Sequence, residues 1–405
     1  KSNKVYLYDD KKIKSKSKEI KKKTVSYNKI IDKNFDNIII SPGIDIKKCQ
    51  LRIFLNKNLK KINTDLDIFF SLHDKNKSIT ITGTNGKSTT AKVLYEILRL
   101  QKLDVRLVGN IGNPILLEKK ITNKTIFVIE ASSYQLEYSK LFSTNIAAIL
   151  NISPDHLERH KSLKNYIKAK FRLLKNQTNK DYAILNTINP FINQEIRTKK
   201  FLSKIIKINK KIKISLLKRI YNPYFMTSGN KENLAFIFEI AKILKIKDEN
   251  IIEILNNFNG LKYRQQIIFK SKNLTIINDS KATSFSSSVS LLKSMSNVYW
   301  IVGGLAKKGD KFLLSRTSCK NFSAYIFGKD KNFFIKEFKK VMKYQSFINL
   351  KILIKKVFFD IKNSKNKNHK NIVFSPASAS FDSFKNFEDR GKYFNNLIKE
   401  FINAE

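Results

Sequence analysis

The sequence has 405 residues and 79 Lys and Arg against 33 Asp and Glu, which gives a formal net charge of +46 at pH 7. Hydrophobic residues make up 42% of the chain and aromatic residues 11%, enough to bury several cores, so the composition excludes an intrinsically disordered protein. No apolar stretch approaches the roughly 18 residues of a membrane span, and Cys49 and Cys319 lie too far apart in sequence to indicate a disulfide framework. We expect a multidomain cytoplasmic protein without a membrane partner.

The positive charge is spread along the chain rather than gathered in one segment. Lysine is accompanied by Asn and Ile in Lys11–Lys23, Leu202–Arg219 and Asn363–Asn371, as an AT-rich coding sequence would favour. We interpret this as a solvated lysine-rich surface that attracts acidic ligands such as nucleotides, and expect no nucleic-acid partner. A basic NTPase stimulated by nucleic acid stays open as an alternative, and it would need aromatic stacking platforms or a basic groove.

The first 72 residues predict a small α/β unit. A strand over Lys4–Tyr8 ends at Asp9, and a second over Asn37–Ile40 ends at the turn Ser41–Gly43. An acidic residue after a strand is where a dinucleotide-type fold binds a ribose hydroxyl. The sequence holds no preceding strand with a Gly-rich loop, so we expect an incomplete Rossmann-like domain that lacks its natural N-terminus.

A phosphate-binding loop follows the clearest strand of the sequence. The buried strand Ser78–Thr82 leads into a glycine-rich loop and then into an amphipathic helix through Leu100. Strand, Gly-x-x-Gly-Lys-Ser-Thr and helix form a phosphate loop, shorter than the usual form, in which Lys87 lies against the β/γ-phosphates and Ser88 binds Mg²⁺. The nucleotide contacts are expected from Gly83, Thr84, Asn85, Gly86, Lys87, Ser88 and Thr89.

Polar residues also follow the next two predicted strands. Glu130 ends the strand Thr125–Ile129, and His156 comes shortly after the strand Asn145–Leu150. A carboxylate at the carboxyl edge of a parallel sheet, beside the phosphate loop, favours a Mg²⁺ ligand. Taken alone, Glu130 could instead start a helix and His156 could be structural.

A weakly patterned stretch over 190–230 is followed by predicted helices over 231–258 and a hinge at Gly260. After this hinge, strands and helices alternate again. The expected strands are Leu274–Ile277, Val298–Val302, Ala324–Phe327 and Asn371–Phe374. Three turns after these strands carry small hydroxyl residues or glycines, a composition that suits carboxylate binding, although each alone is ordinary strand-to-helix chemistry. These turns are Asp279–Thr283, Gly303–Lys307 and Ser375–Ser380.

Seven segments together resemble one protein family, the Mur ligases. They are GTNGKSTT (83–90), GNIGNP (109–114), IEASSYQLE (129–137), LNISPDHLERH (150–160), YIKAK (166–170), NDSKAT (278–283) and SPASASFDSFKNFEDRG (375–391). The last two resemble in particular the members that add D-glutamate. The resemblance implies three α/β domains: a Rossmann-like domain over 1–72, a central P-loop ATPase domain with a mostly parallel sheet over 73–262, and a Rossmann-like amino-acid-binding domain over 263–405.

The resemblance also implies roles for individual residues. ATP and two Mg²⁺ ions are implied as cofactors, with Ser88, Glu130, His156 and a carbamylated Lys170 as metal ligands. Lys87, Glu130, His156, Lys170 and Lys281 would be catalytic, and Asn233, Arg264 and Asp279 would contact ATP. UDP-N-acetylmuramoyl-L-alanine would bind at Asp9, Ser41, Gly43 and Asn110, and D-glutamate at Thr283, Lys307, Ser380 and Phe387.

The implied activity is that of a monomeric, ATP-dependent ligase of peptidoglycan synthesis, which forms an amide bond through an acyl phosphate. A ligase of the same superfamily that resembles folylpolyglutamate synthase is the nearest alternative. A non-catalytic binding protein is a further one, because the chain departs from the family pattern at Phe236 and Tyr263.

Overall fold

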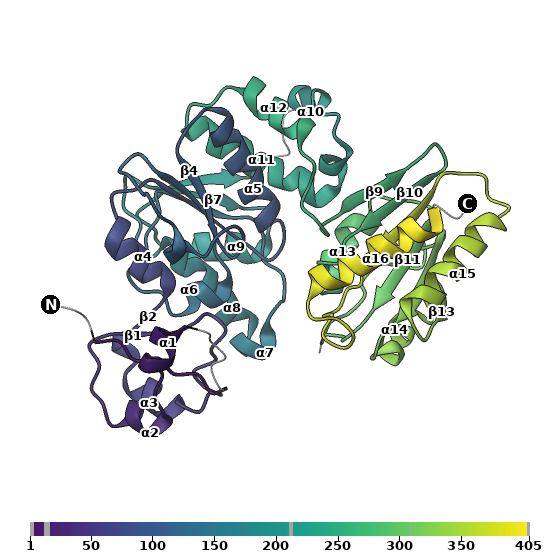
Figure 1. The fold of residues 1–405 in the computed structure, drawn as a ribbon. Coiled ribbons are helices and arrows are strands. Elements are labelled where there is room, and N and C mark those ends of the chain that lie inside the picture. Colours follow the sequence, from purple (N-terminus) through teal and green to yellow (C-terminus); the bar gives the residue numbers. More distant parts are fainter. Residues whose placement is uncertain (1–3, 12–16, 210–213, 308, 403–405) are drawn as a thin grey trace. The chain divides into compact units, whose positions relative to one another are not determined.

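The chain divides into two compact units, each with its own sheet and hydrophobic core (Figure 1). The computed structural model describes residues 4–11, 17–209, 214–307 and 309–402. The first unit comprises Lys1–Ala91 and Leu98–Asn209, and the second comprises Lys92–Ile97 and Lys210–Glu405. Within the described ranges, no helix is both long and apolar enough to cross a membrane.

The N-terminal part of the first unit is a small α/β segment. Its elements are α1 (Lys18–Lys23), α2 (Tyr27–Ile31), β1 (Ile38–Ile39), α3 (Arg52–Lys57) and β2 (Ile62–Asn63). Strands β1 and β2 pair in parallel. The prediction of a strand over Lys4–Tyr8 is wrong, because Leu7 forms only an isolated bridge with Thr24. Thr24 caps the end of α1, so the bridge cannot extend into a ladder.

The rest of the first unit is built on a six-stranded sheet in which all neighbouring strands are parallel. Its strands are β3 (Ser78–Thr82), β4 (Val105–Gly109), β5 (Ile126–Glu130), β6 (Ile146–Ile149), β7 (Tyr182–Asn186) and β8 (Lys204–Ile208). Its helices are α4 (Asp65–His73), α6 (Ser133–Glu137), α7 (Leu157–His160), α8 (Leu163–Phe171) and α9 (Pro190–Thr198). Helix α5 (Lys87–Leu100) begins and ends in this unit, whereas its residues Lys92–Ile97 are assigned to the second. Three of the strands, β3, β5 and β6, match the prediction, whereas β8 and α9 fall in the stretch that we predicted as weakly patterned.

The sheet order β4-β5-β3-β6-β7-β8 places β3 between strands that come later in the chain. All five residues of β3 are buried, and its two isoleucines alternate with hydroxyl side chains. Helices α4, α6 and α8 cover one face, through side chains such as Phe69, Leu136 and Phe171 (Figure 1). The order of strands reverses around β3, and open parallel sheets bind ligands outside the carboxyl ends at such a point.

The second unit contains a mixed six-stranded sheet and a helical segment that precedes it. The helical segment is α10 (Ile214–Lys218), α11 (Ser228–Ile243) and α12 (Asp248–Asn257). The strands are β9 (Gln266–Lys270), β10 (Leu274–Asn278), β11 (Val298–Gly303), β12 (Phe322–Phe327), β13 (Lys343–Ser346) and β14 (Lys370–Phe374). They lie in the order β13-β12-β11-β14-β10-β9, and only the edge strand β9 is antiparallel to its neighbour.

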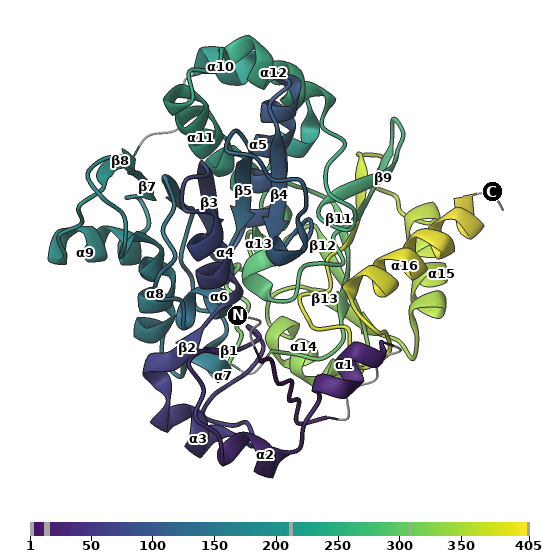
Figure 2. The same ribbon diagram turned by 60° about the vertical axis from the view of Figure 1, so that its left-hand side comes forward.

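Helices cover both faces of this second sheet (Figure 2). They are α13 (Phe285–Leu292), α14 (Lys331–Phe338), α15 (Leu350–Lys362) and α16 (Phe387–Ile402). Successive residues of a strand point to opposite faces. Accordingly, Trp300 packs with α13 and α14 while Ile301 packs with α15 and α16. The predicted α/β class and the parallel central sheet are confirmed.

Candidate active site

The predicted phosphate loop lies between the end of β3 and the start of α5. Gly86 has a φ of +84°, a conformation that side chains with a Cβ rarely adopt. A Cβ on Gly83 would lie 3.1 Å from the Cβ of Leu150 and 3.3 Å from the backbone nitrogen of Asn151. The glycines therefore allow the loop to turn sharply while it packs closely against the residues that follow β6.

Asn151 braces this loop through its side chain and its backbone. The backbone N–H of Asn85 donates to Oδ1 of Asn151 over 2.8 Å, and Nδ2 of Asn151 donates to the Asn85 carbonyl over 3.1 Å. The N–H of Thr84 donates to the Asn151 carbonyl over 2.9 Å. The sequence assigned no role to Asn151, although its place directly after a predicted strand was a usable signal.

A hydroxyl, a carboxylate and an amide meet at the carboxyl ends of β3 and β5. The Ser88 hydroxyl donates to Oε2 of Glu130 over 2.6 Å, and Nδ2 of Asn110 donates to Oε1 over 2.8 Å. Ser88 and Glu130 are both buried. Because hydroxyl and carboxylate oxygens are the ligands that Mg²⁺ prefers, this pair fits a magnesium ion beside the loop.

Two lysine amines converge on one backbone oxygen of the loop. Nζ of Lys170 and Nζ of Lys87 donate to the Gly83 carbonyl over 2.8 and 3.0 Å. Lys170 is 1% exposed, and its amine lies 4.6 Å from the ring centre of Tyr166. Burial, reinforced by repulsion from Lys87, holds the pKa of Lys170 well below its usual range, and Glu130 opposes the shift only in part. A neutral amine is the form that reacts with CO₂, so Lys170 fits the carbamylated ligand that the resemblance implies.

His156 sits in a constrained backbone conformation just before α7. Its φ is +53°, which is uncommon for a residue other than glycine. Nδ1 of its ring lies 2.9 Å from the hydroxyl of Tyr134. Burial lowers the pKa of His156, and the neighbouring Glu158 carboxylate opposes this shift.

The predicted contacts with the nucleotide-linked substrate are less closely assembled. The turn Ser41–Gly43 is attached to the rest of the first unit because Nη1 of Arg159 donates to the Gly43 carbonyl over 3.2 Å. Asp9 is exposed, and its carboxylate accepts a hydrogen bond from the N–H of Lys11. The grouping of Asp9 with the Ser41–Gly43 turn therefore stays a prediction.

In the second unit, a hydrogen-bond chain links two of the predicted ATP contacts. Asn233 donates to Asn230, Asn230 donates to the Gln265 side chain, and the N–H of Gln265 donates to Oδ1 of Asp279 over 3.1 Å. Burial raises the pKa of Asp279 to about 7, and the positive charge of Arg264 partly offsets the shift. Asn233, Arg264 and Asp279 therefore belong to one connected region.

A buried arginine, which we did not single out in the sequence, joins two of the predicted turns. Arg390 is 0% exposed. Its Nη2 donates to the carbonyl oxygens of Ser280 and Ser378 over 2.7 and 3.0 Å, and its Nε donates to the Ser280 hydroxyl over 3.1 Å. Arg390 lies within the SPASASFDSFKNFEDRG segment, so the sequence did mark its neighbourhood. The spacing of that segment does not show which backbone oxygens the arginine contacts.

The predicted amino-acid contacts lie around these turns. Nζ of Lys281 lies 4.1 Å from the ring centre of Phe387, a cation–π contact. Thr283 is exposed and Ser380 is buried. Leu305, two residues before Lys307, forms a bridge with Ala379, which directly precedes Ser380, so these two turns are adjacent.

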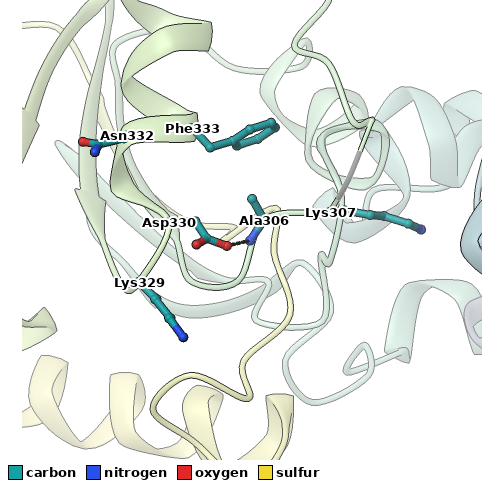
Figure 3. A pocket seen from close by; sticks show the side chains of 6 residues that line it. All are labelled: Ala306, Lys307, Lys329, Asp330, Asn332 and Phe333. Carbon is teal, nitrogen blue, oxygen red and sulfur yellow. Dashed lines mark hydrogen bonds between the residues drawn. The ribbon is translucent and has the colours of Figure 1, made fainter.

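A cavity of about 370 Å³ opens beside Lys307 (Figure 3). It is lined by Ala306, Lys307, Lys329, Asp330, Asn332 and Phe333. The Asp330 carboxylate accepts the N–H of Ala306 over 2.8 Å, and Figure 3 shows the Lys307 side chain extending away from it. Burial lowers the pKa of Lys307. The lining therefore combines two lysines with one carboxylate, that of Asp330.

Comparisons with known proteins place the chain among its relatives. A family model described as the Mur ligase middle domain matches residues 81–247. A UDP-N-acetylmuramoylalanine–D-glutamate ligase from Rickettsia felis is 34% identical over 383 residues, which cover 90% of this chain and 84% of that protein.

Two solved structures resemble this one in fold. MurF from Acinetobacter baumannii has a TM-score of 0.62 at 16% identity, over 82% of this chain and 79% of that one. MurF ligase from Thermotoga maritima, in complex with ADP, has a TM-score of 0.58 at 13% identity, over 86% of this chain and 92% of that one.

Proposed function

This chain belongs to the Mur ligase family, and from that membership we propose that it joins D-glutamate to UDP-N-acetylmuramoyl-L-alanine. It is an ATP-dependent ligase that forms an amide bond in the synthesis of a peptidoglycan precursor. The observations that carry the substrate proposal are a phosphate loop in the first unit and hydroxyl-rich turns in the second unit, whose composition suits a carboxylate. A monomeric state and a cytoplasmic location stay predictions from the sequence.

The chemistry requires activation of a carboxylate, because its resonance-stabilised anion is a poor electrophile. The L-alanyl carboxylate oxygen attacks the γ-phosphorus of ATP, the bond to the β-γ bridging oxygen breaks, and ADP leaves. The product is an acyl phosphate. The amine of D-glutamate then attacks the acyl carbon, inorganic phosphate leaves, and the nitrogen loses a proton.

The loop residues of this chain stabilise charge on the transferring phosphoryl group. The amine of Lys87 is held beside the loop carbonyls of Gly83 and Thr84, at 3.0 and 2.8 Å, so it is positioned at the entrance of the loop. Loop N–H groups and the N-terminus of α5 add further positive potential. Such pre-oriented donors are a main source of rate enhancement in phosphoryl transfer.

Two magnesium ions would be held at this edge of the sheet. Ser88 and Glu130 supply oxygen ligands for one, and His156 with carbamylated Lys170 would supply ligands for the other. When bound, Mg²⁺ neutralises charge on the phosphoryl oxygens. The neutral amine of Lys170 attacks CO₂, forms an N–C bond and loses a proton, which turns the side chain into a carboxylate.

The second unit would bind the amino acid. Lys307 lies beside the cavity of Figure 3, and Lys281 is held over the Phe387 ring, so both offer positive charge to a carboxylate. D-Glutamate carries two carboxylates besides its amine, which matches a site with two separate cationic side chains. The turn around Ser380 adds hydroxyl donors.

Phosphate release tests the proposal directly. The purified chain is incubated with ATP, Mg²⁺ and UDP-N-acetylmuramoyl-L-alanine, together with D-glutamate, L-glutamate, L-lysine or no amino acid. We expect release that depends on D-glutamate. A parallel incubation replaces UDP-N-acetylmuramoyl-L-alanine with a folate substrate. Phosphate release that depends on L-glutamate in this incubation would favour the folylpolyglutamate synthase-like alternative.

A lysine variant ties that activity to the loop. Lys87→Ala should lower D-glutamate-dependent phosphate release by at least about 100-fold, because it removes a positioned charge from the transferring group. Lys75→Ala is the matched control, since Lys75 is an exposed lysine in the same unit. Wild-type turnover in Lys87→Ala would contradict the assignment of the loop.

A further inference from the structure

The hydroxyl of Tyr134 has no part in the reaction described above, yet it makes a close contact with a residue that does. It lies 2.9 Å from Nδ1 of His156, and the two ring centres are 4.9 Å apart. Tyr134 belongs to α6, whereas His156 lies just before α7, so the contact joins two separate segments at the carboxyl edge of the sheet.

The Tyr134 contact is the shortest of three polar contacts that surround the His156 ring. Nε2 lies 3.5 Å from a carboxylate oxygen of Asp155, and Nδ1 lies 3.6 Å from one of Glu158. Only the tyrosine contact is within ordinary hydrogen-bond length. The orientation of the ring is therefore fixed mainly by Tyr134 and by the left-handed backbone of His156 itself.

The tyrosine is in turn held in place. The guanidinium carbon of Arg159 lies 5.1 Å from the centre of the Tyr134 ring, and Nε of Arg159 donates to Glu137 over 2.9 Å. This cation–π contact fixes the plane of the ring, so the hydroxyl stays directed at the histidine.

A neutral imidazole can bind a metal through only one nitrogen, because the other carries the proton. We propose that Tyr134 is a positioning residue for His156: its hydroxyl oxygen accepts the Nδ1 proton and leaves the Nε2 lone pair available to Mg²⁺. The proposal rests on the proposed function, which makes His156 a metal ligand. Hydrogen-bond partners of this kind commonly orient metal-binding histidines.

The test uses two tyrosine variants and reads the histidine directly. Tyr134→Phe keeps the ring over Arg159 and removes only the hydroxyl. Tyr138→Phe is the matched control, because the Tyr138 ring also lies near Arg159, at 5.8 Å, and burial raises the pKa of both hydroxyls to about 12. The chain has only four histidines, so ¹⁵N labelling of the imidazoles gives a spectrum that can be assigned.

With MgADP bound, we expect His156 to be protonated on Nδ1 in the wild type and in Tyr138→Phe. In Tyr134→Phe that tautomer should lose its dominance, and Mn²⁺ affinity measured by electron paramagnetic resonance should fall about 10-fold. A wild-type tautomer and wild-type Mn²⁺ affinity in Tyr134→Phe would overturn the proposal.

The wild-type spectrum alone also decides the question, even if Tyr134→Phe fails to fold. A His156 that stays protonated on Nε2 at saturating MgADP would overturn the proposal, whatever the variants do. Neither measurement requires turnover. Failure of D-glutamate-dependent phosphate release would instead count against the proposed function, so the two outcomes are distinguishable.

Discussion

Replacement of Arg390 by alanine should destabilise the C-terminal sheet more than any change at the surface. The guanidinium is 0% exposed and donates to two backbone oxygens and two hydroxyls of Ser280 and Ser378. Without it, the two carbonyl oxygens stay buried without this donor, at about 1–3 kcal/mol each. A relief of desolvation offsets part of the loss, because burial lowers the pKa of Arg390 to about 10. We expect a net loss of about 4 kcal/mol.

Urea denaturation followed by tryptophan fluorescence measures this loss in the right part of the chain. The single tryptophan, Trp300, is buried in the core of the same sheet, so its signal reports on that sheet. With a slope of about 2 kcal/mol per molar urea, the midpoint of Arg390→Ala should fall by about 2 M. Arg316→Ala, a change of an exposed arginine in the same unit, should leave the midpoint unchanged.

A midpoint for Arg390→Ala within about 0.3 M of the wild type would refute this reasoning, because a structural clamp cannot be removed without cost. Arg390→Lys provides an intermediate case. It keeps the charge, but a single amine cannot reproduce the planar fork that reaches both turns, so its midpoint should lie between the other two.

Three further predictions concern other positions. The pKa of Asp279 is raised in the folded protein to about 7, so the free energy of unfolding, followed by Trp300 fluorescence, should fall as pH rises from about 4 to about 7. Asp279→Asn should flatten this pH dependence. An unchanged pH dependence in the variant would show that Asp279 is not its source. Gly304→Ala should lower the urea midpoint by about 1 M, because its φ is +132° and a Cβ would lie 2.7 Å from a carbonyl oxygen. Gly309→Ala is the control, since Gly309 has a φ of +80° but lies in open space, and it should lower the midpoint less. Equal shifts of the two midpoints would contradict the predicted clash at Gly304. Lys170→Ala should abolish phosphate release and bicarbonate should not restore it, while removal of dissolved CO₂ should lower wild-type activity reversibly; full activity of the variant would exclude Lys170 as a metal ligand.

The sequence predicted most of the strands that are buried on both faces and missed the edge strands β4, β8, β9 and β13; it also missed the interior strand β7. The residues of β3 and β5 are almost entirely buried. Strand β5 has four apolar residues before Glu130, whereas in β3 isoleucines alternate with Ser and Thr. In contrast, all four residues of β13 are exposed, and β8 carries lysines at both exposed positions. An edge strand pairs on one side only and needs no apolar run, so hydrophobic pattern cannot reveal it.

The candidate site divides in the same way. Loop residues such as Lys87 and Ser88 were predictable because their spacing is local and the backbone geometry requires it. Residues that contact the predicted site residues from far along the chain were not predictable from the sequence. Tyr166 reaches Thr84 across 82 positions, and Arg390 reaches Ser280 across 110. Contacts of that kind depend on tertiary packing, which composition and periodicity do not encode.

The central position of β3 has a consequence for how the chain is made. During synthesis β3 emerges early, but its two neighbours, β5 and β6, end only at Glu130 and Ile149. Until then, the strand that carries the phosphate loop has unpaired backbone groups on both sides and exposes Ile79 and Ile81, which are buried in the folded protein. Long-range parallel pairing is intrinsically slow, and such exposed strands aggregate readily. The ribosome-bound chain therefore passes through a stage of roughly 70 residues in which protection by a chaperone matters most, and at 5–20 residues per second this stage lasts about 4–14 s.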